Sequence, residues 1–154
     1  MPTREQVFSA LQTLLSDVPG INFVSRRMML PNDFTSSTGT VDTQLPCLLI
    51  WEQNEETRHT GPNQGLGIPP KRTWEAWLVV YFKNTSATVP GATIINPILD
   101  AIETALAPNV VTNTQTLGGL VSHTWIEGPT TVALGDVDTE GFGGAVVPVR
   151  MLIP

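Results

Sequence analysis

The amino-acid sequence predicts an α+β fold, in which two amphipathic helices cover one face of a mostly antiparallel, five-stranded sheet. Two segments repeat apolar residues at the helical period, and five read as strands from alternation or from short apolar runs. Their order is helix, three strands, helix, two strands, which favours helices gathered on one side of a sheet. With 154 residues, 41% of them hydrophobic, we expect one domain over residues 1–154.

The first helix is predicted over Thr3 to Val18. Thr3 and Gln6 have the spacing of a capping box, in which each side chain bonds a free amide of the first turn. Pro19-Gly20 supplies the stop. The apolar stripe of this helix consists of Val7, Leu11, Leu14, Leu15 and Val18.

Three strands are predicted next, over Ile21 to Met29, Pro46 to Gln53 and Lys71 to Lys83. The third alternates most clearly, and both of its faces become apolar towards its end, which favours a central position in the sheet. Leu30 to Gln44 reads as a loop. Thr57 to Pro70 is rich in glycine and proline, and we expect it to form an exposed arm.

The second helix is predicted to begin with Asn96 as N-cap and Pro97 at the first helical position, and to end before Pro108. Its apolar stripe consists of Ile95, Ile98, Leu99, Ile102 and Leu106.

The last two strands are predicted over Leu120 to Glu127 and Ala145 to Ile153, because both segments alternate with a period of two. Pro129 to Gly144 between them is long enough for a wide hairpin connection.

Charge and cysteine content narrow the function classes. The net charge is -6, divided as -1 for residues 1–83 and -5 for residues 84–154, which disfavours duplex nucleic acid as a partner. Cys47 is the one cysteine, so no disulfide forms within the chain and a reducing cytoplasm fits best. The longest apolar run has six residues, Trp77 to Phe82, far below the roughly 20 of a membrane-spanning helix. We expect no signal peptide either, since the N-terminus lacks a continuous apolar stretch.

One stretch resembles the start of a calcium-binding loop. Asp136, Asp138 and Glu140 have the spacing of the first three carboxylate ligands, and Gly141 follows at the position of the turn. The twelfth position is Val147, which supplies no bidentate carboxylate. A solvated acidic turn is therefore the favoured interpretation, and we expect no metal.

The sequence shows no recognisable set of catalytic residues. Cys47 lies inside an apolar strand, where burial favours an inert thiol. His59 in the arm and His123 in a strand have no cysteine or second histidine at ligand spacing. Gly65-Leu66-Gly67 and Gly118-Gly119 do not open a helix, as a phosphate cradle requires. We expect no catalytic residue, no cofactor and no enzymatic activity.

The four tryptophans, Trp51, Trp74, Trp77 and Trp125, all fall on predicted strands, where core packing is their ordinary role. Trp74 and Trp77 differ in parity and are expected to point to opposite faces of the sheet. One of the two then needs cover, either from a loop or from another subunit.

The order of several segments matches a known family. These segments are the first helix, Leu45-Pro46-Cys47-Leu48-Leu49-Ile50-Trp51, the long arm before Trp74-Glu75-Ala76-Trp77-Leu78-Val79-Val80-Tyr81-Phe82, Asn96-Pro97-Ile98-Leu99-Asp100-Ala101-Ile102, His123-Thr124-Trp125-Ile126-Glu127-Gly128 and the closing strand. This organisation resembles the tail terminator, or tail completion, proteins of long-tailed bacteriophages, the group that includes the lambda-type minor tail protein U. The resemblance covers almost the full chain.

The resemblance implies a structural virion protein of the tail or neck that is made in the host cytoplasm. Such proteins form a ring, usually of six copies, on the head-proximal end of the tail tube, stop tube polymerisation and offer the head-joining surface. The implied partners are further copies of the chain, the tail tube protein and head-to-tail connector or neck proteins. DNA would only pass through the lumen, whose walls an acidic C-terminal half would make repulsive to phosphates.

A ring requires two different patches that meet between neighbours, and unlike charges fix their register. We expect the basic residues flanking the arm to face the acidic residues of the last connection. The candidate subunit or tube interface comprises Arg58, Lys71, Arg72, Trp77, Asp136, Asp138 and Glu140. The alternatives are another head-to-tail connector or neck protein and, from a different class, a small bacterial ligand-binding domain or enzyme.

Overall fold

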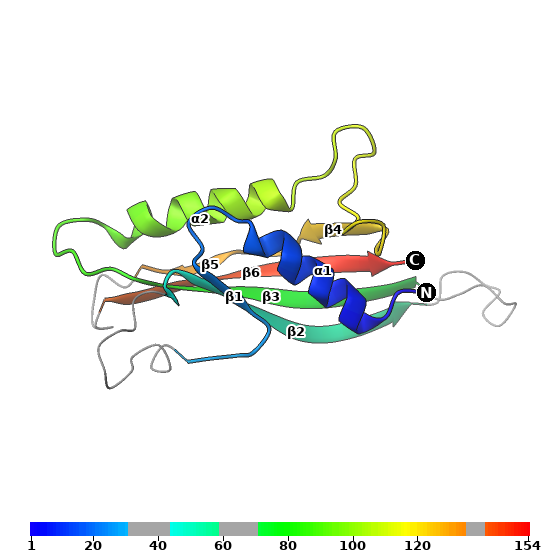
Figure 1. The fold of residues 1–154 in the computed structure, drawn as a ribbon, viewed down its shortest axis with the longest axis horizontal. Coiled ribbons are helices and arrows are strands. Elements are labelled where there is room, and N and C mark those ends of the chain that lie inside the picture. Colours follow the sequence, from blue (N-terminus) through cyan, green and yellow to red (C-terminus); the bar gives the residue numbers. More distant parts are fainter. Residues whose placement is uncertain (31–43, 59–70, 135–140) are drawn as a thin grey trace, which may run out of the picture.

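The computed structural model describes residues 1–30, 44–58, 71–134 and 141–154. Within these ranges the elements are α1 (Arg4–Ser16), β1 (Phe23–Ser25), β2 (Cys47–Arg58), β3 (Lys71–Lys83), α2 (Gly91–Ala105), β4 (His123–Ile126), β5 (Thr131–Ala133) and β6 (Phe142–Ile153). The strands form one sheet in the order β1-β2-β3-β6-β4, and β5 also pairs with β6 (Figure 1). The pair β1–β2 is parallel and the other pairs are antiparallel, so the predicted α+β class is confirmed.

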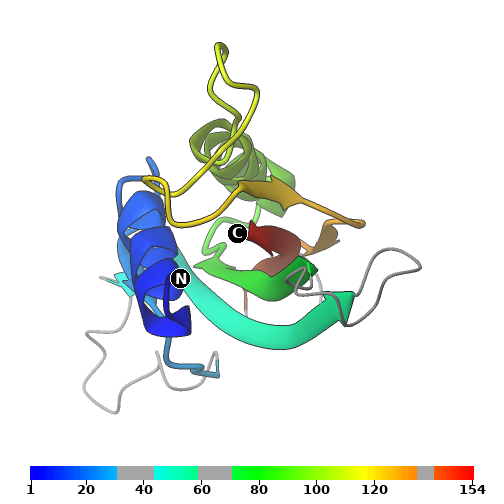
Figure 2. The same ribbon diagram turned by 90° about the vertical axis from the view of Figure 1, so that its right-hand side faces the viewer.

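Both helices pack on one face of the curved sheet, as predicted (Figure 2). The core between the helices and the sheet is formed by one side of each long strand and one stripe of each helix. Its largest fully buried side chains include Phe8, Leu11, Leu15, Leu48, Ile50, Leu78, Phe82, Ile95, Ile102 and Met151. A smaller cluster of Leu45, Cys47, Leu49 and Val79 lies apart from this core.

Helix α1 begins where the capping box predicts. Thr3 is the N-cap, its hydroxyl accepts from the amide of Gln6, and the Gln6 side chain accepts in turn from the amide of Thr3 at 2.9 Å. Arg26, which follows β1, donates to Glu5 of α1 and to Glu52 of β2. These contacts hold the exposed side of the helix against the first two strands.

Helix α2 begins at Gly91 after Pro90 as N-cap, so the predicted start at Asn96 is wrong. Pro97 lies inside the helix and removes the hydrogen bond that its N–H would donate to the carbonyl of Thr93. Thr93 and Pro97 both lie on the exposed side of the helix. Ile95 of the predicted stripe is buried inside the helix, and the earlier start adds Gly91 to the buried residues. Burial of the apolar face therefore outweighs the local proline signal.

The strands also differ in length from the prediction. β1 and β4 are shorter than predicted, whereas β2 continues to Arg58 past an irregularity between Glu52 and Glu55. β3 has the predicted bounds and lies between β2 and β6, the predicted central position. β6 begins three residues early, at Phe142, because Lys83 at the end of β3 extends its pairing to that residue. β5 was not predicted, since its three residues are all exposed and show no pattern.

Candidate interaction surfaces

Among the described residues, no group of three or more histidine, cysteine or acidic side chains is placed to hold a metal ion. Val147, the failed twelfth position of the calcium motif, is buried in the core. Burial raises the pKa of the Cys47 thiol to about 11, which keeps it protonated. His123 accepts a hydrogen bond from the amide of Gln115 and stacks on Trp125, so its role is structural. His59 lies outside the described residues.

A small hollow opens between β2, β3 and β6. It encloses about 30 Å³ and is lined by Asn54, Glu56, Thr73, Glu75 and Arg150. That volume holds about one water molecule and is an order of magnitude below that of a typical ligand pocket. Nor is any helix in the described part of the chain long and apolar enough to cross a membrane.

The predicted division of Trp74 and Trp77 between the two faces of the sheet is confirmed. Trp74 is 2% exposed and lies in the core, stacked on Phe8 with ring centroids 6.2 Å apart. Trp77 lies on the other face, where its ring meets that of Trp51 edge-on at 5.4 Å. Its cross-strand neighbours are Trp51 on β2 and Pro148 on β6.

We call Trp51, Trp77 and Pro148 the aromatic shelf. No helix in the described part of the chain covers it, and Trp51 is 44% exposed. The indole N–H of Trp77 donates to the carboxylate of Glu75 at 3.2 Å, so the ring has a fixed orientation. A shelf of this kind places a large, rigid apolar area in water, which is typical of protein interfaces.

Ionic contacts within the chain engage two of the predicted interface residues, Arg72 and Arg58. Arg72 donates to Glu55 at 2.6 Å, and Arg4 of α1 pairs with the same carboxylate. The guanidinium carbons of Arg4 and Arg72 lie 5.0 and 5.4 Å from the ring centre of Trp74. The pKa of Glu55 is lowered to about 2, mainly by the hydrogen bond from the Arg72 guanidinium. Arg72 therefore joins β3 to β2 and α1.

Arg58 and Lys71 are cross-strand neighbours at the end of β2 and β3. Arg58 pairs with Glu56 at 2.7 Å, and its side chain is 71% exposed. Lys71 is exposed as well and has no ion pair among the described residues. These two exposed cations therefore stand side by side at one end of the sheet.

The acidic half of the predicted interface, Asp136, Asp138 and Glu140, lies outside the described residues. Gly141, where the described chain resumes, accepts a hydrogen bond from the amide of Asn84, just beyond the far end of β3 from Lys71. Twelve residue steps along β3 separate the two ends, about 40 Å. The predicted contact between the two charged groups stays a prediction.

The loop at 107–116 carries an exposed apolar tip that sequence reasoning missed. Val110 is 98% exposed and Val111 is 87% exposed; we call these two residues the valine tip. The side-chain oxygen of Asn109 accepts from the amide of Val111 at 2.8 Å, and the Asn109 amide donates to the carbonyl of Thr114 at 3.0 Å. The loop is thus closed on itself by hydrogen bonds.

Gln115 fixes the base of this loop. Its side-chain amide donates to the carbonyl of Ala105 at the end of α2, and its carbonyl accepts from the amide of Thr124 in β4. Both neighbouring elements therefore hold the loop where it leaves the body. In Figure 2 the loop stands out beyond α2 at the top, whereas β2 lies at the bottom.

Comparison with known proteins finds a likeness of structure and none of family. No family model matches the chain, and no curated protein matches it. Among solved structures, it is similar to a chain in the virion of a native gene transfer agent (GTA) particle, with a TM-score of 0.49 and 11% sequence identity, over 99% of this chain and 94% of that one. A likeness at this score and identity assigns neither a family nor a function.

Proposed function

We propose that the chain is a structural protein of a phage-type tail or neck, and that it is a tail terminator: a ring on the head-proximal end of the tail tube that stops polymerisation and offers the head-joining surface. The organisation of the chain resembles that family over almost its full length. The observation that carries an assembly role is the aromatic shelf, which the helices leave uncovered.

The shelf lies on a long, continuous part of the sheet. β3 pairs with β2 on one side and with β6 on the other over most of its length, so the shelf rests on rigid strands. Desolvating a pair of packed indoles stabilises a contact by much more than burying scattered aliphatic side chains. A neighbouring subunit or the tube protein would supply the cover.

Charge supports a head-to-tail arrangement. We propose that Arg58 and Lys71 of one copy face the acidic residues Asp136, Asp138 and Glu140 of the next, and that a neighbouring subunit covers Trp77. Because Lys71 and Gly141 stand at opposite ends of β3, the contact joins different copies. Arg72 belongs to the predicted set, but its pairing with Glu55 makes Lys71 the cleaner position for a test.

The distribution of charge also suits a passage for DNA. Residues 84–154 carry five of the six net negative charges. If these residues line the lumen, like charge repels the phosphates and the duplex slides without binding. The ring itself catalyses no reaction in this proposal.

The test is polymerisation of the tail tube protein of the same virus, with and without this protein, followed by negative-stain imaging. We expect shorter tubes that carry a ring on one end. Lys71→Glu should weaken capping by charge repulsion, whereas Asp17→Lys, an exposed charge reversal at the end of α1, serves as the matched control. Tubes of unchanged length with bare ends at both sides would overturn the proposed function.

A further inference from the structure

We propose that the valine tip of one copy docks on the aromatic shelf of a second copy, so that the chain assembles head to tail through these two surfaces. The inference rests on the proposed function, since it names the contact that would build the ring. Four features support it: the hydrogen-bonded loop of the tip, the paired strands under the shelf, the separation of the two surfaces, and the charges around them.

The tip is built to be presented to a partner. Two valines with almost complete exposure stand at the end of a loop that Asn109 and Gln115 close with hydrogen bonds. An ordered loop loses little conformational entropy on binding, and this raises the affinity of an apolar contact. Asn113 adopts a positive φ of 54° within this turn, a conformation that asparagine tolerates better than most residues.

The shelf provides the complementary surface. Trp51 and Trp77 present one edge-on aromatic pair, and Pro148 extends the apolar strip onto β6. Branched aliphatic side chains pack well against aromatic rings in neighbouring strands, and the same contact suits two chains. The indole N–H of Trp77 donates to Glu75, so docking does not leave this donor without a partner.

A second copy is the favoured occupant because both surfaces belong to the same chain, and the loop of the tip stands at the top of the molecule whereas β2, which carries Trp51, lies at the bottom (Figure 2). Contact of one tip with the next shelf covers both surfaces in every copy of a closed ring. An unrelated partner on the shelf would leave the valine tip in water.

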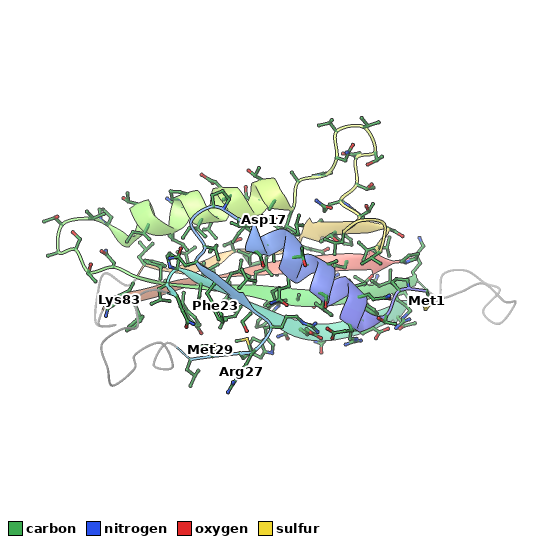
Figure 3. The ribbon with its side chains drawn as sticks, in the orientation of Figure 1. Met1, Asp17, Phe23, Arg27, Met29 and Lys83 are labelled. Carbon is green, nitrogen blue, oxygen red and sulfur yellow. The ribbon has the colours of Figure 1, made fainter. Side chains whose placement is uncertain are left out.

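Charges around the two surfaces are complementary. α2, which leads into the tip, exposes Asp100 and Glu103, and the sequence contains no basic residue between Lys83 and Arg150. On the shelf side Lys71 and Arg27 have no ion-pair partner among the described residues, whereas Glu56 and Glu127 pair with Arg58 and Arg150, and Glu75 accepts from Trp77. Figure 3 shows Arg27 pointing away from the sheet on the β2 side. Unlike charges of this kind steer one copy onto the next.

The test uses two variants of the full chain and one control, each compared with the wild type by sedimentation and native mass. V110D/V111D removes the tip at exposed positions, and Trp51→Glu places a charge on the shelf. Val89→Asp is the control, because it introduces one negative charge at another exposed valine. Thermal unfolding checks that each variant folds, and Trp51→Thr replaces the glutamate variant if that one does not.

We expect the wild type and Val89→Asp to assemble, and the tip and shelf variants to be monomeric, with self-association weaker by roughly 100-fold or more. An equimolar mixture of the tip and shelf variants should form dimers, because one intact tip meets one intact shelf. A monomeric wild type, a tip variant that assembles normally, or a mixture of folded variants without dimers would each overturn the inference.

Tube capping separates this inference from the proposed function. If the copies assemble through tip and shelf but leave tubes uncapped, the contact stands and the terminator role fails. If a monomeric wild type caps tubes, the terminator role stands and the contact fails.

Discussion

Glu55→Gln tests the ionic cluster that ties α1 to the sheet. The Glu55 carboxylate accepts from Arg72 on β3 and pairs with Arg4 on α1, beside the buried ring of Trp74. Glutamine keeps the shape of the side chain and removes its charge. The variant should therefore unfold more easily near neutral pH without a change of fold.

The size of the effect follows from the pKa and the exposure of the side chain. A pKa of about 2, against an ordinary 4.5, corresponds to a preference of ~3 kcal/mol for the charged form. The Glu55 and Arg72 side chains are 26% and 27% exposed, so solvent screening and the ordering of long side chains reduce the net contribution. We expect Glu55→Gln to lower the free energy of unfolding by about 1 kcal/mol at pH 7.

The pH dependence gives the sharper test. Because the folded-state pKa lies below the unfolded value, the contribution is fully present above about pH 4.5 and is lost as the pH falls towards 2. Urea unfolding of the wild type and the variant should therefore differ at pH 7 and converge near pH 2. Glu103→Gln on α2 is the control, with no difference expected. If Glu55→Gln lowered the free energy of unfolding equally at both pH values, or did not lower it at pH 7, the charge of Glu55 would not be the cause.

Two further predictions concern the sheet. A Cβ at Gly143 would lie 2.4 Å from Phe82 Cζ and 2.7 Å from the carbonyl oxygen of Ala133, so Gly143→Ala should destabilise the fold by roughly 2 kcal/mol or more. Gly118→Ala, which has open space but a positive φ, should cost only about 1 kcal/mol in thermal or urea unfolding; equal losses would show that the Gly143 contact does not matter. The Cys47 thiol, with a pKa of about 11, should react with an aromatic disulfide reagent at pH 8 only after unfolding in urea; rapid labelling of the folded protein would contradict its burial.

The sequence predicted best where local signals and burial agree. Lys71 to Lys83 alternates without interruption, and the strand has the predicted bounds. The capping box of Thr3 and Gln6 fixes the start of α1 for the same reason. At Asn96-Pro97 the signals disagree: the pair is typical of a helix start, but the buried stripe extends back to Gly91, and tertiary packing decides.

The features that sequence reasoning missed depend on contacts between distant segments. β5 pairs through its backbone with β6 and has no side-chain pattern of its own. The valine tip reads in sequence as two apolar residues in a loop. Its exposure follows from the hydrogen bonds of Asn109 and Gln115, which hold the loop away from the core. The uncovered shelf was anticipated from the parity of Trp74 and Trp77, although Trp51 and Pro148 were not assigned to it.

In the proposed assembly, another copy of the chain covers the face of the sheet opposite the helices. The native mass of the purified wild-type protein over a range of concentrations tests this. We expect one closed assembly of several copies, with Trp77 and Trp51 protected from solvent quenchers of fluorescence. A monomer at every concentration, with those tryptophans open to the quencher, would contradict it.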